Sequence, residues 1–229
     1  MKTRNKALLL VLCAVILAAA SVFGTMAYLT DTEAVENTFT VGKVKLGDAD
    51  VNEKGLDEAL VNEYGLPINN ETDKTVVNVG DAPRVQGNDY KLIPGHLYTK
   101  DPTVHVKNDS ENSYIFVKVG NGIAGIEATE TDIYKKIDTQ ILNNGWEKLT
   151  GYDGVYWKRW EKSSTTTGTT DLKVFSEFKI DGEKVTAAVL ENYKNAEITV
   201  NAYAIQEDGF TTPADAWVAG KFGNIVTGN

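Results

Sequence analysis

The residues of this chain that are best suited to chemistry are two histidines. His96 follows the turn at Pro94-Gly95, and His105 lies in the alternating segment Thr103-Val-His-Val-Lys107. Zinc proteases of a common type place two ligands on one helix as His-Glu-x-x-His, and this motif does not occur in the sequence. Phosphate-binding loops, dinucleotide fingerprints and serine-nucleophile motifs do not occur either. We therefore expect exposed or packed polar histidines, no catalytic residue and no enzyme activity.

Acidic side chains suggest a second kind of chemistry, the binding of calcium. Asp48, Asp50 and Asn52 have the spacing that opens an EF-hand loop. The position that requires glycine is Glu53, and the position that requires a bidentate glutamate is Ala59. Because the match fails where the geometry is most demanding, we expect a solvated acidic loop with no metal and no cofactor.

Aromatic side chains cluster in one region, at Trp146, Tyr152, Tyr156, Trp157 and Trp160. Exposed rings could stack on sugars or on another protein. The alternation along 155–160 favours a structural role instead. In that interpretation Val155 and Trp157 face the core, while Tyr156 and Trp160 cover the other face of a sheet.

The elements that position these residues are predicted to be short strands, because glycine and Asp/Asn clusters interrupt the sequence about every ten residues. Alternation predicts strands at 38–46, 85–93, 103–107, 114–119, 146–149, 155–160, 172–180 and 198–204, with a β-bulge at Gly42-Lys43. In the strand 114–119, Ile115, Val117 and Val119 share the face that we expect to line the core. The fold class is therefore all-β, an antiparallel sandwich.

Helices are predicted only as short insertions. Apolar residues at helical spacing indicate helices at 130–142, 187–190 and 213–219, the last with Thr212 as its cap and Pro213 at its first position. The polar and acidic segment 48–75 interrupts the strand pattern, and Leu56, Ala59, Leu60 and Tyr64 predict a short helix inside this insertion. The chain after residue 27 is expected to form a single domain, 28–229.

The N-terminus has the composition of an export signal. A basic start at Lys2, Arg4 and Lys6 is followed by the uncharged, apolar run 7–23. Thr25 and Ala27 are small residues at the −3 and −1 positions of a cut, so residues 1–27 are predicted to be a signal peptide in helical form, and the secreted chain starts at Tyr28. An uncleaved membrane anchor is the alternative, because the run is near the lower length limit of a membrane span.

Cleavage there removes three basic residues from the 229, so 202 residues remain and the net charge falls from −9 to −12. This acidity argues against nucleic acid and anionic membrane surfaces as partners. The only cysteine, Cys13, lies within the predicted signal, and Leu12 before it does not fit a lipoprotein anchor. The mature domain is therefore expected to rely on its core and its sheets rather than on disulfides.

The junction sequences Ala27-Tyr-Leu-Thr-Asp-Thr32 and Asn37-Thr-Phe-Thr-Val-Gly42 resemble those of substrates of the SipW-type signal peptidase. Among such substrates are the TasA/camelysin proteins, secreted Gram-positive matrix proteins. Later segments resemble the same family, including Lys100-Asp-Pro-Thr-Val104, Tyr114-Ile-Phe-Val-Lys118, Gly154-Val-Tyr-Trp157 and Ile198 to Gln206. The resemblance implies a jelly-roll sandwich, a secreted or cell-surface location and the SipW-type peptidase as a partner. Camelysin-like proteins have been classed with metallopeptidases, but the residues of this chain offer no constellation for that activity.

The resemblance also implies a route of assembly. The extended segment 28–37, with its apolar residues Tyr28, Leu29, Ala34 and Val35, is predicted to be a donor strand that completes the sandwich of the next subunit. This makes a fibre-forming surface or biofilm-matrix protein the first hypothesis. A disordered N-terminus would leave a monomeric adhesin for glycans or surface proteins as the second, and a secreted peptidase is the third.

Overall fold

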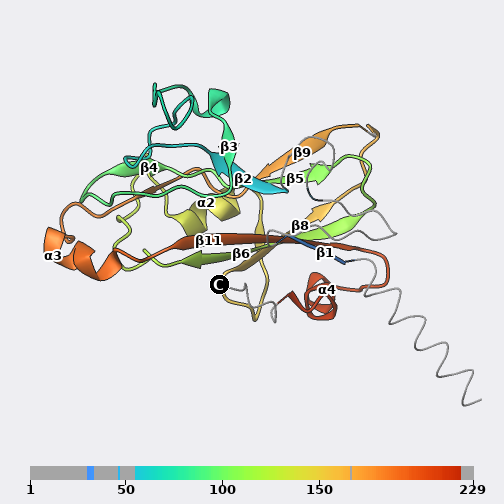
Figure 1. Ribbon diagram of the computed structural model, residues 1–229. Helices are drawn as coiled ribbons and strands as arrows, with labels where there is room; N and C mark the ends of the chain where they lie inside the picture. Colours follow the sequence, from blue (N-terminus) through green and yellow to red (C-terminus); the bar gives the residue numbers. More distant parts are fainter. Residues whose placement is uncertain (1–29, 34–45, 47–54, 166, 223–229) are drawn as a thin grey trace, which may run out of the picture.

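The computed structural model describes residues 30–33, 46, 55–165 and 167–222. These residues form mostly β-strands in antiparallel sheets with a few short helices, so the predicted all-β class is confirmed. Figure 1 shows the strands in two layers, one containing β6, β8 and β11 and the other containing β2, β5 and β9. The predicted signal at 1–27 and the predicted bulge at Gly42-Lys43 lie outside the described residues.

The first layer is a five-stranded sheet in the order β1, β11, β6, β8, β7. The bounds of these strands are Thr30–Glu33, Ile198–Gln206, Ser113–Asn121, Val155–Trp160 and Glu147–Lys148. β6 and β11 pair along their whole lengths, from Ser113 opposite Gln206 to Asn121 opposite Ile198. Both sequences alternate in the way a strand requires, and together they form the centre of the sheet.

The two faces of β6 enter different apolar clusters. Ile115, Val117 and Val119 belong to the main cluster between the layers, which confirms the predicted core face. Tyr114 and Phe116 point to the opposite face and belong to a second cluster with Trp217. The central strand of the sheet is therefore covered on both sides.

The second layer consists of shorter strands. A four-stranded sheet has the order β3, β2, β5, β9, with bounds Arg84–Val85, Leu56–Ala59, Thr103–Lys107 and Thr169–Lys173. A two-stranded sheet pairs β10, Glu177–Lys179, with β4, Leu97–Thr99. Leu46, which is buried, forms an isolated bridge with Val106 of β5.

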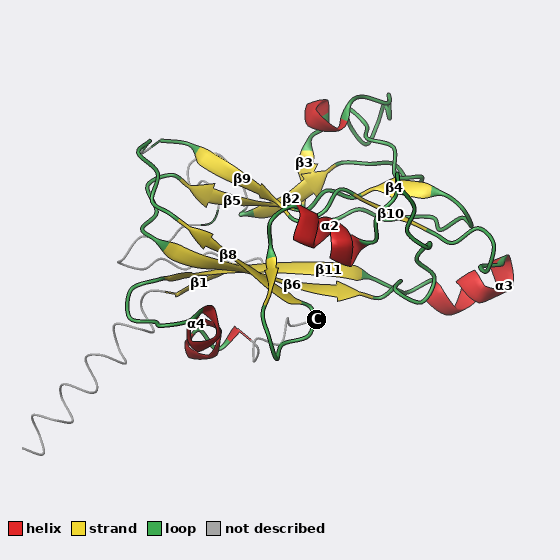
Figure 2. Ribbon diagram, turned by 180° about the vertical axis from the view of Figure 1, so that it is seen from behind, coloured by secondary structure: helices red, strands yellow, loops and turns green. Residues whose placement is uncertain are grey.

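The helices are short, and their bounds are Val79–Asp81 for η1, Ile137–Asn143 for α2, Ala187–Leu190 for α3, Glu191–Tyr193 for η2 and Pro213–Ala219 for α4. α4 starts as predicted: Thr212 Oγ1 accepts a hydrogen bond from Asp215 N at 3.1 Å, and Pro213 occupies the first turn. Figure 2 shows α4 against the first layer on the side away from the second layer. No helix in the described part of the chain is long and apolar enough to span a membrane.

The helix predicted within 48–75 is wrong for the residues that can be checked. Leu56–Ala59 form β2, which pairs with β5 and β3, and turns and isolated bridges follow up to position 75. Residues 57–61 are all buried, so both faces of this short strand are covered. Because side chains on both faces of the strand are buried, the apolar residues Leu56, Ala59 and Leu60 are three and four positions apart, which is also the spacing typical of a helix.

Other element boundaries also need correction. The strand predicted at 172–180 is divided into β9 and β10, because the consecutive residues Val174 and Phe175 are both fully buried as the chain passes from one sheet to another. The helix predicted at 130–142 starts only at Ile137, and Ile133 is 95% exposed. Of the strand predicted at 85–93, only Val85 lies in a strand, which is β3, and β4 was not predicted.

Candidate functional site

The candidate site is an edge of the five-stranded sheet, where the N-terminal strand meets the last strand. β11 pairs with β6 along one edge and with β1 along the other, from Thr30 opposite Ile205 to Glu33 opposite Ala202. β1 lies within the segment 28–37 that was predicted to be an extended donor. The candidate donor residues Tyr28, Leu29, Ala34 and Val35, like the peptidase recognition residues Thr25, Ala27 and Tyr28, are outside the described residues.

β1 covers only half of this edge. Its partners end at Ala202, and among the described residues no strand pairs with Ile198–Asn201 on that side. Ile198–Asn201 also line a cavity of about 1110 Å³, together with residues of η2 and of the segment 86–92. Main-chain groups on an edge of this kind can accept a further extended strand.

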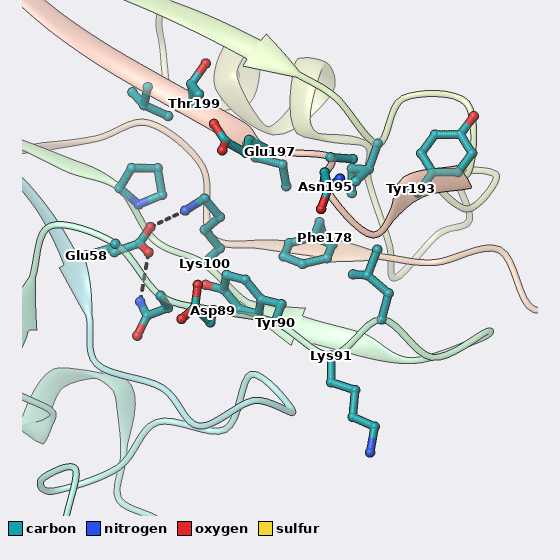
Figure 3. A pocket seen from close by; sticks show the side chains of 18 of the residues that line it. Glu58, Asp89, Tyr90, Lys91, Lys100, Phe178, Tyr193, Asn195, Glu197 and Thr199 are labelled. Atoms are coloured by element: carbon teal, nitrogen blue, oxygen red, sulfur yellow. Dashed lines mark hydrogen bonds and ion pairs between the residues drawn. The ribbon is translucent and has the colours of Figure 1, made fainter. Parts of the chain in front are cut away.

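The opposite wall of this cavity is polar and buried. Lys100 Nζ donates to Glu58 Oε2 at 2.5 Å, and the two side chains are only 9% and 4% exposed. Asn88 Nδ2 donates to the other oxygen of the same carboxylate at 2.8 Å. Figure 3 shows Glu58 and Lys100 pointing toward each other, with Tyr90 and Phe178 beside them. The Lys100 ammonium lies 5.7 Å from the centre of the Tyr90 ring.

Burial raises the pKa of Tyr90, and the nearby carboxylates of Glu58 and Asp101 raise it further. The Tyr90 hydroxyl therefore remains protonated at neutral pH, and it donates to the carbonyl of Thr99 at 3.1 Å. This hydroxyl has the role of a fixed donor rather than of a base.

A second polar cluster crosses the four-stranded sheet around Arg84. Its Nε donates to Asp57 Oδ1 at 2.7 Å, and its Nη1 donates to Asp101 Oδ2 at 2.7 Å. Asp101 Oδ1 also accepts the backbone N–H of Ala59. The guanidinium thus joins β3 to β2 and to the chain between β4 and β5.

His105 belongs to this second cluster and is not an outward-facing residue, since its side chain is 13% exposed. Its Nε2 lies 3.0 Å from Asp57 Oδ1, and its Nδ1 lies 2.6 Å from Asp171 Oδ1. The hydrogen bond to Asp57 is the main reason that the pKa of His105 is raised, and burial opposes the shift. Because a carboxylate faces each nitrogen, the imidazolium form is favoured and the ring is poorly suited to act as a base.

The other candidates from the sequence lie elsewhere. His96 Nε2 is 2.8 Å from the carbonyl oxygen of Tyr64, and its ring contacts Tyr98 edge-on, so the two histidines have separate partners. The run at Asp48, Asp50 and Asn52 is outside the described residues. Within the described ranges, no group of three or more His, Cys, Asp or Glu side chains could hold a metal ion.

The aromatic residues pack as the alternation predicted, with one difference. Tyr156 and Trp160 share one cluster, and Val155 and Trp157 contact the other. The main core between the layers is on the side of Tyr156 and Trp160, whereas we expected it on the side of Trp157. All four side chains are thus engaged in packing rather than arranged as an open stacking platform.

Comparison with known proteins gives no relative, because no protein-family model, no curated protein and no solved structure matches the chain. Neither polar cluster was predicted from the sequence. The available signal was a set of charged residues inside segments of strand-like pattern, above all Asp57-Glu58 and Lys100-Asp101.

Proposed function

We propose that this protein is a secreted structural protein of the cell surface or biofilm matrix, and that its subunits assemble into fibres by exchange of the N-terminal strand. A SipW-type signal peptidase cuts after Ala27 and releases a chain that starts at Tyr28. The sheets close as a jelly roll in which the edge of β11 is completed by a strand from the neighbouring subunit. The export signal and the leader junction in the sequence support the location.

The observation that carries this proposal is the pairing of Thr30–Glu33 with the edge of β11. This strand comes from the segment next to the proposed cut, and it is held by a short antiparallel register of four residues. A short edge strand can be replaced by the same strand of another copy, because the main-chain hydrogen bonds are identical in both arrangements. The remaining edge at Ile198–Asn201 and its adjacent cavity provide room for a longer donor.

Exchange of this kind produces a head-to-tail contact. Each subunit donates a strand from one surface and accepts a strand on another, so the contact does not close on itself and propagates as a filament. Before cleavage the signal would tether the donor to the membrane, and cleavage therefore acts as the trigger of polymerisation. The strong negative charge keeps subunits apart until strands exchange.

The test compares a chain that starts at Tyr28 with a chain that starts at Asn37, at the same concentration, salt and pH. We expect filaments by negative-stain microscopy only from the longer chain. A peptide of residues 28–37, added in excess, should occupy the acceptor edge and shorten the filaments, while a scrambled peptide should not. Identical filaments from both chains, or none from either over a broad concentration range, would contradict strand exchange.

A monomeric secreted binding module is the second candidate, and the cavity beside β11 is the observation that favours it. Size-exclusion chromatography with light scattering separates the two. A monomer at all concentrations, with the segment 28–37 protected from proteolysis in its own chain, would support the binding module.

A further inference from the structure

The buried polar group beside the cavity contains three side chains in an unusual combination. Glu58 places one carboxylate oxygen 2.5 Å from Lys100 Nζ and the other 2.8 Å from Asn88 Nδ2. A buried lysine–glutamate pair alone is an ordinary salt bridge. Here the carboxylate also accepts from a carboxamide, so Glu58 contacts an amine through one oxygen and an acyl group's amide nitrogen through the other.

Hydrogen bonds fix the orientation of the Asn88 carboxamide, as an acyl donor requires. Its Nδ2 donates to Glu58 and, at 3.0 Å, to the carbonyl of Ala59, while its Oδ1 accepts the backbone N–H of Val61 at 2.9 Å. The N–H of Val61 withdraws electron density from the carboxamide oxygen and faces the position where negative charge develops during attack on Cγ. The leaving nitrogen already contacts the group that can protonate it.

Lys100 and Glu58 are buried and in direct contact. Their side chains are 9% and 4% exposed, and the rings of Tyr90 and Phe178 lie beside them. Removal from water is costly for a charged pair, whereas a neutral amine beside a carboxylic acid does not carry this cost. The neutral amine is a nucleophile.

We propose that Lys100 and Asn88 form an intramolecular isopeptide bond, with Glu58 as the catalytic residue. Glu58 takes one proton from Nζ, and the neutral amine moves to Asn88 Cγ and forms the new C–N bond. Glu58 then protonates Nδ2, the Cγ–Nδ2 bond breaks, and ammonia leaves. The second proton of the attacking nitrogen passes to Glu58 and then to ammonia, which is released as ammonium. No oxidant, reductant or further reactant is needed.

The bond would give this chain a covalent brace that it cannot obtain from disulfides, since its only cysteine is Cys13. It joins the segment after β3 to the segment after β4, and thus fixes one wall of the cavity beside β11. The proposal does not rest on fibre assembly, and a cross-linked monomer would support it while contradicting the proposed function.

The test is a tryptic map of the folded wild-type protein, produced from the full chain, with its N-terminus determined first. Arg84 and Lys91 bound the peptide 85–91, and an unmodified Lys100 divides the segment 92–107. We expect an intact mass that is lower by one ammonia, no cleavage after Lys100, and the peptide 85–91 joined through Asn88 to 92–107. Linear 85–91 with cleavage after Lys100 would overturn the proposal. So would loss of ammonia without the joined peptides, which indicates a succinimide.

Single substitutions test the separate roles of Lys100, Asn88 and Glu58. Lys100→Arg and Asn88→Ala should both have the mass that their sequences predict and release 85–91 as a linear peptide. Glu58→Gln keeps a side chain of the same shape but cannot carry the proton, and it should abolish the joined peptides. Lys91→Arg, an exposed position in the same segment, is the control and should leave the bond intact. A Glu58→Gln protein that still cross-links would remove Glu58 from the mechanism.

Discussion

The two layers of this molecule are held together in different ways. The five-stranded layer has long central strands, β6 and β11, which bury apolar side chains on both faces. The four-stranded layer has strands of two to five residues and buries charged groups, namely Asp57, Glu58, Lys100 and Asp101. One layer is stabilised by many similar contacts and the other by a few specific partners.

This difference determines where a single substitution has an effect. An apolar core tolerates many substitutions between apolar residues, because each side chain contributes only a small share of the total free energy of burial. A buried charge depends on its partner, because desolvation costs several kcal/mol for each ion and only a well-placed opposite charge offsets it. The short strands thus gain a fixed arrangement from the Arg84 and Lys100 contacts, at the cost of sensitivity to the loss of either.

The largest effect is expected from a charge placed in the apolar layer. Val117 is fully buried between the layers, so Val117→Asp introduces a carboxylate without a partner. We expect a loss of about 4 kcal/mol or more, enough to unfold a protein of ordinary stability. Urea denaturation followed by circular dichroism measures it. Lys118→Asp, at an exposed position of the same strand, is the control, and an equal loss there would show that the burial of Val117 does not cause the effect.

The second prediction removes a partner from the charged layer. Arg84→Met keeps most of the side-chain volume but leaves the buried carboxylates of Asp57 and Asp101 without their guanidinium. We expect a loss of about 3 kcal/mol in the free energy of unfolding. Arg159→Met removes exposed pairs with Glu161 and Glu207, which are screened by solvent, and should cost much less. If the two variants lose the same amount, the contrast between the layers fails.

The same contrast explains how much of the fold could be predicted. The strands β5, β6, β8 and β11 could be predicted because they are rich in β-branched and aromatic residues, although β6, β8 and β11 have apolar residues on both faces. β2 was mistaken for a helix because it is buried on both faces and its buried residues include Asp57 and Glu58. In a strand as short as β2, with both faces covered, periodicity alone does not distinguish a strand from a helix.

The polar clusters could not be derived from the sequence because their members are distant along the chain. Glu58 contacts Lys100 across 42 positions, and His105 contacts Asp171 across 66. The pairing of β5 with β9 places His105 opposite Asp171, and Lys100 reaches Glu58 of β2 from the chain between β4 and β5. The donor segment 28–37 was the part of the candidate site that local sequence could indicate, and its residues Thr30–Glu33 form a strand at the sheet edge. Its exchange between subunits remains a prediction.

The third prediction concerns the pH dependence of the charged layer. The folded state raises the pKa of His105, chiefly through Asp57, so the imidazolium stabilises the fold at pH values below the ordinary pKa of histidine. This contribution is lost as the pH rises through the raised pKa. His105→Gln should therefore cost about 1.5 kcal/mol near pH 5.5, and much less near pH 9.

Measuring the unfolding free energy of wild type and variant at each pH cancels the titration of other groups. Asp171→Asn, which alters the more exposed of the two carboxylate partners, should reduce the pH dependence only in part. A cost for His105→Gln that is constant with pH would mean that the ring is not charged in the folded protein, and that the Asp57 contact is an ordinary hydrogen bond.

The smallest effect is expected at the outer surface of the apolar layer. Thr212 Oγ1 caps α4, and the helix presents Trp217 to Phe116 and Tyr203 of the sheet, with ring centres 5.3 and 5.5 Å apart. Thr212→Ala removes the capping hydrogen bond from Asp215 N and the bond that the hydroxyl donates to Asp215 Oδ2, and it leaves these ring contacts in place, so we expect a loss of about 1 kcal/mol. Thr211→Ala, one residue before the cap, is the matched control and should be close to neutral. Because many apolar contacts hold α4 on this face, the helix should remain packed against the sheet. The fluorescence of Trp217 should therefore change little. A loss as large as that of Arg84→Met would show that the apolar layer also depends on a single contact.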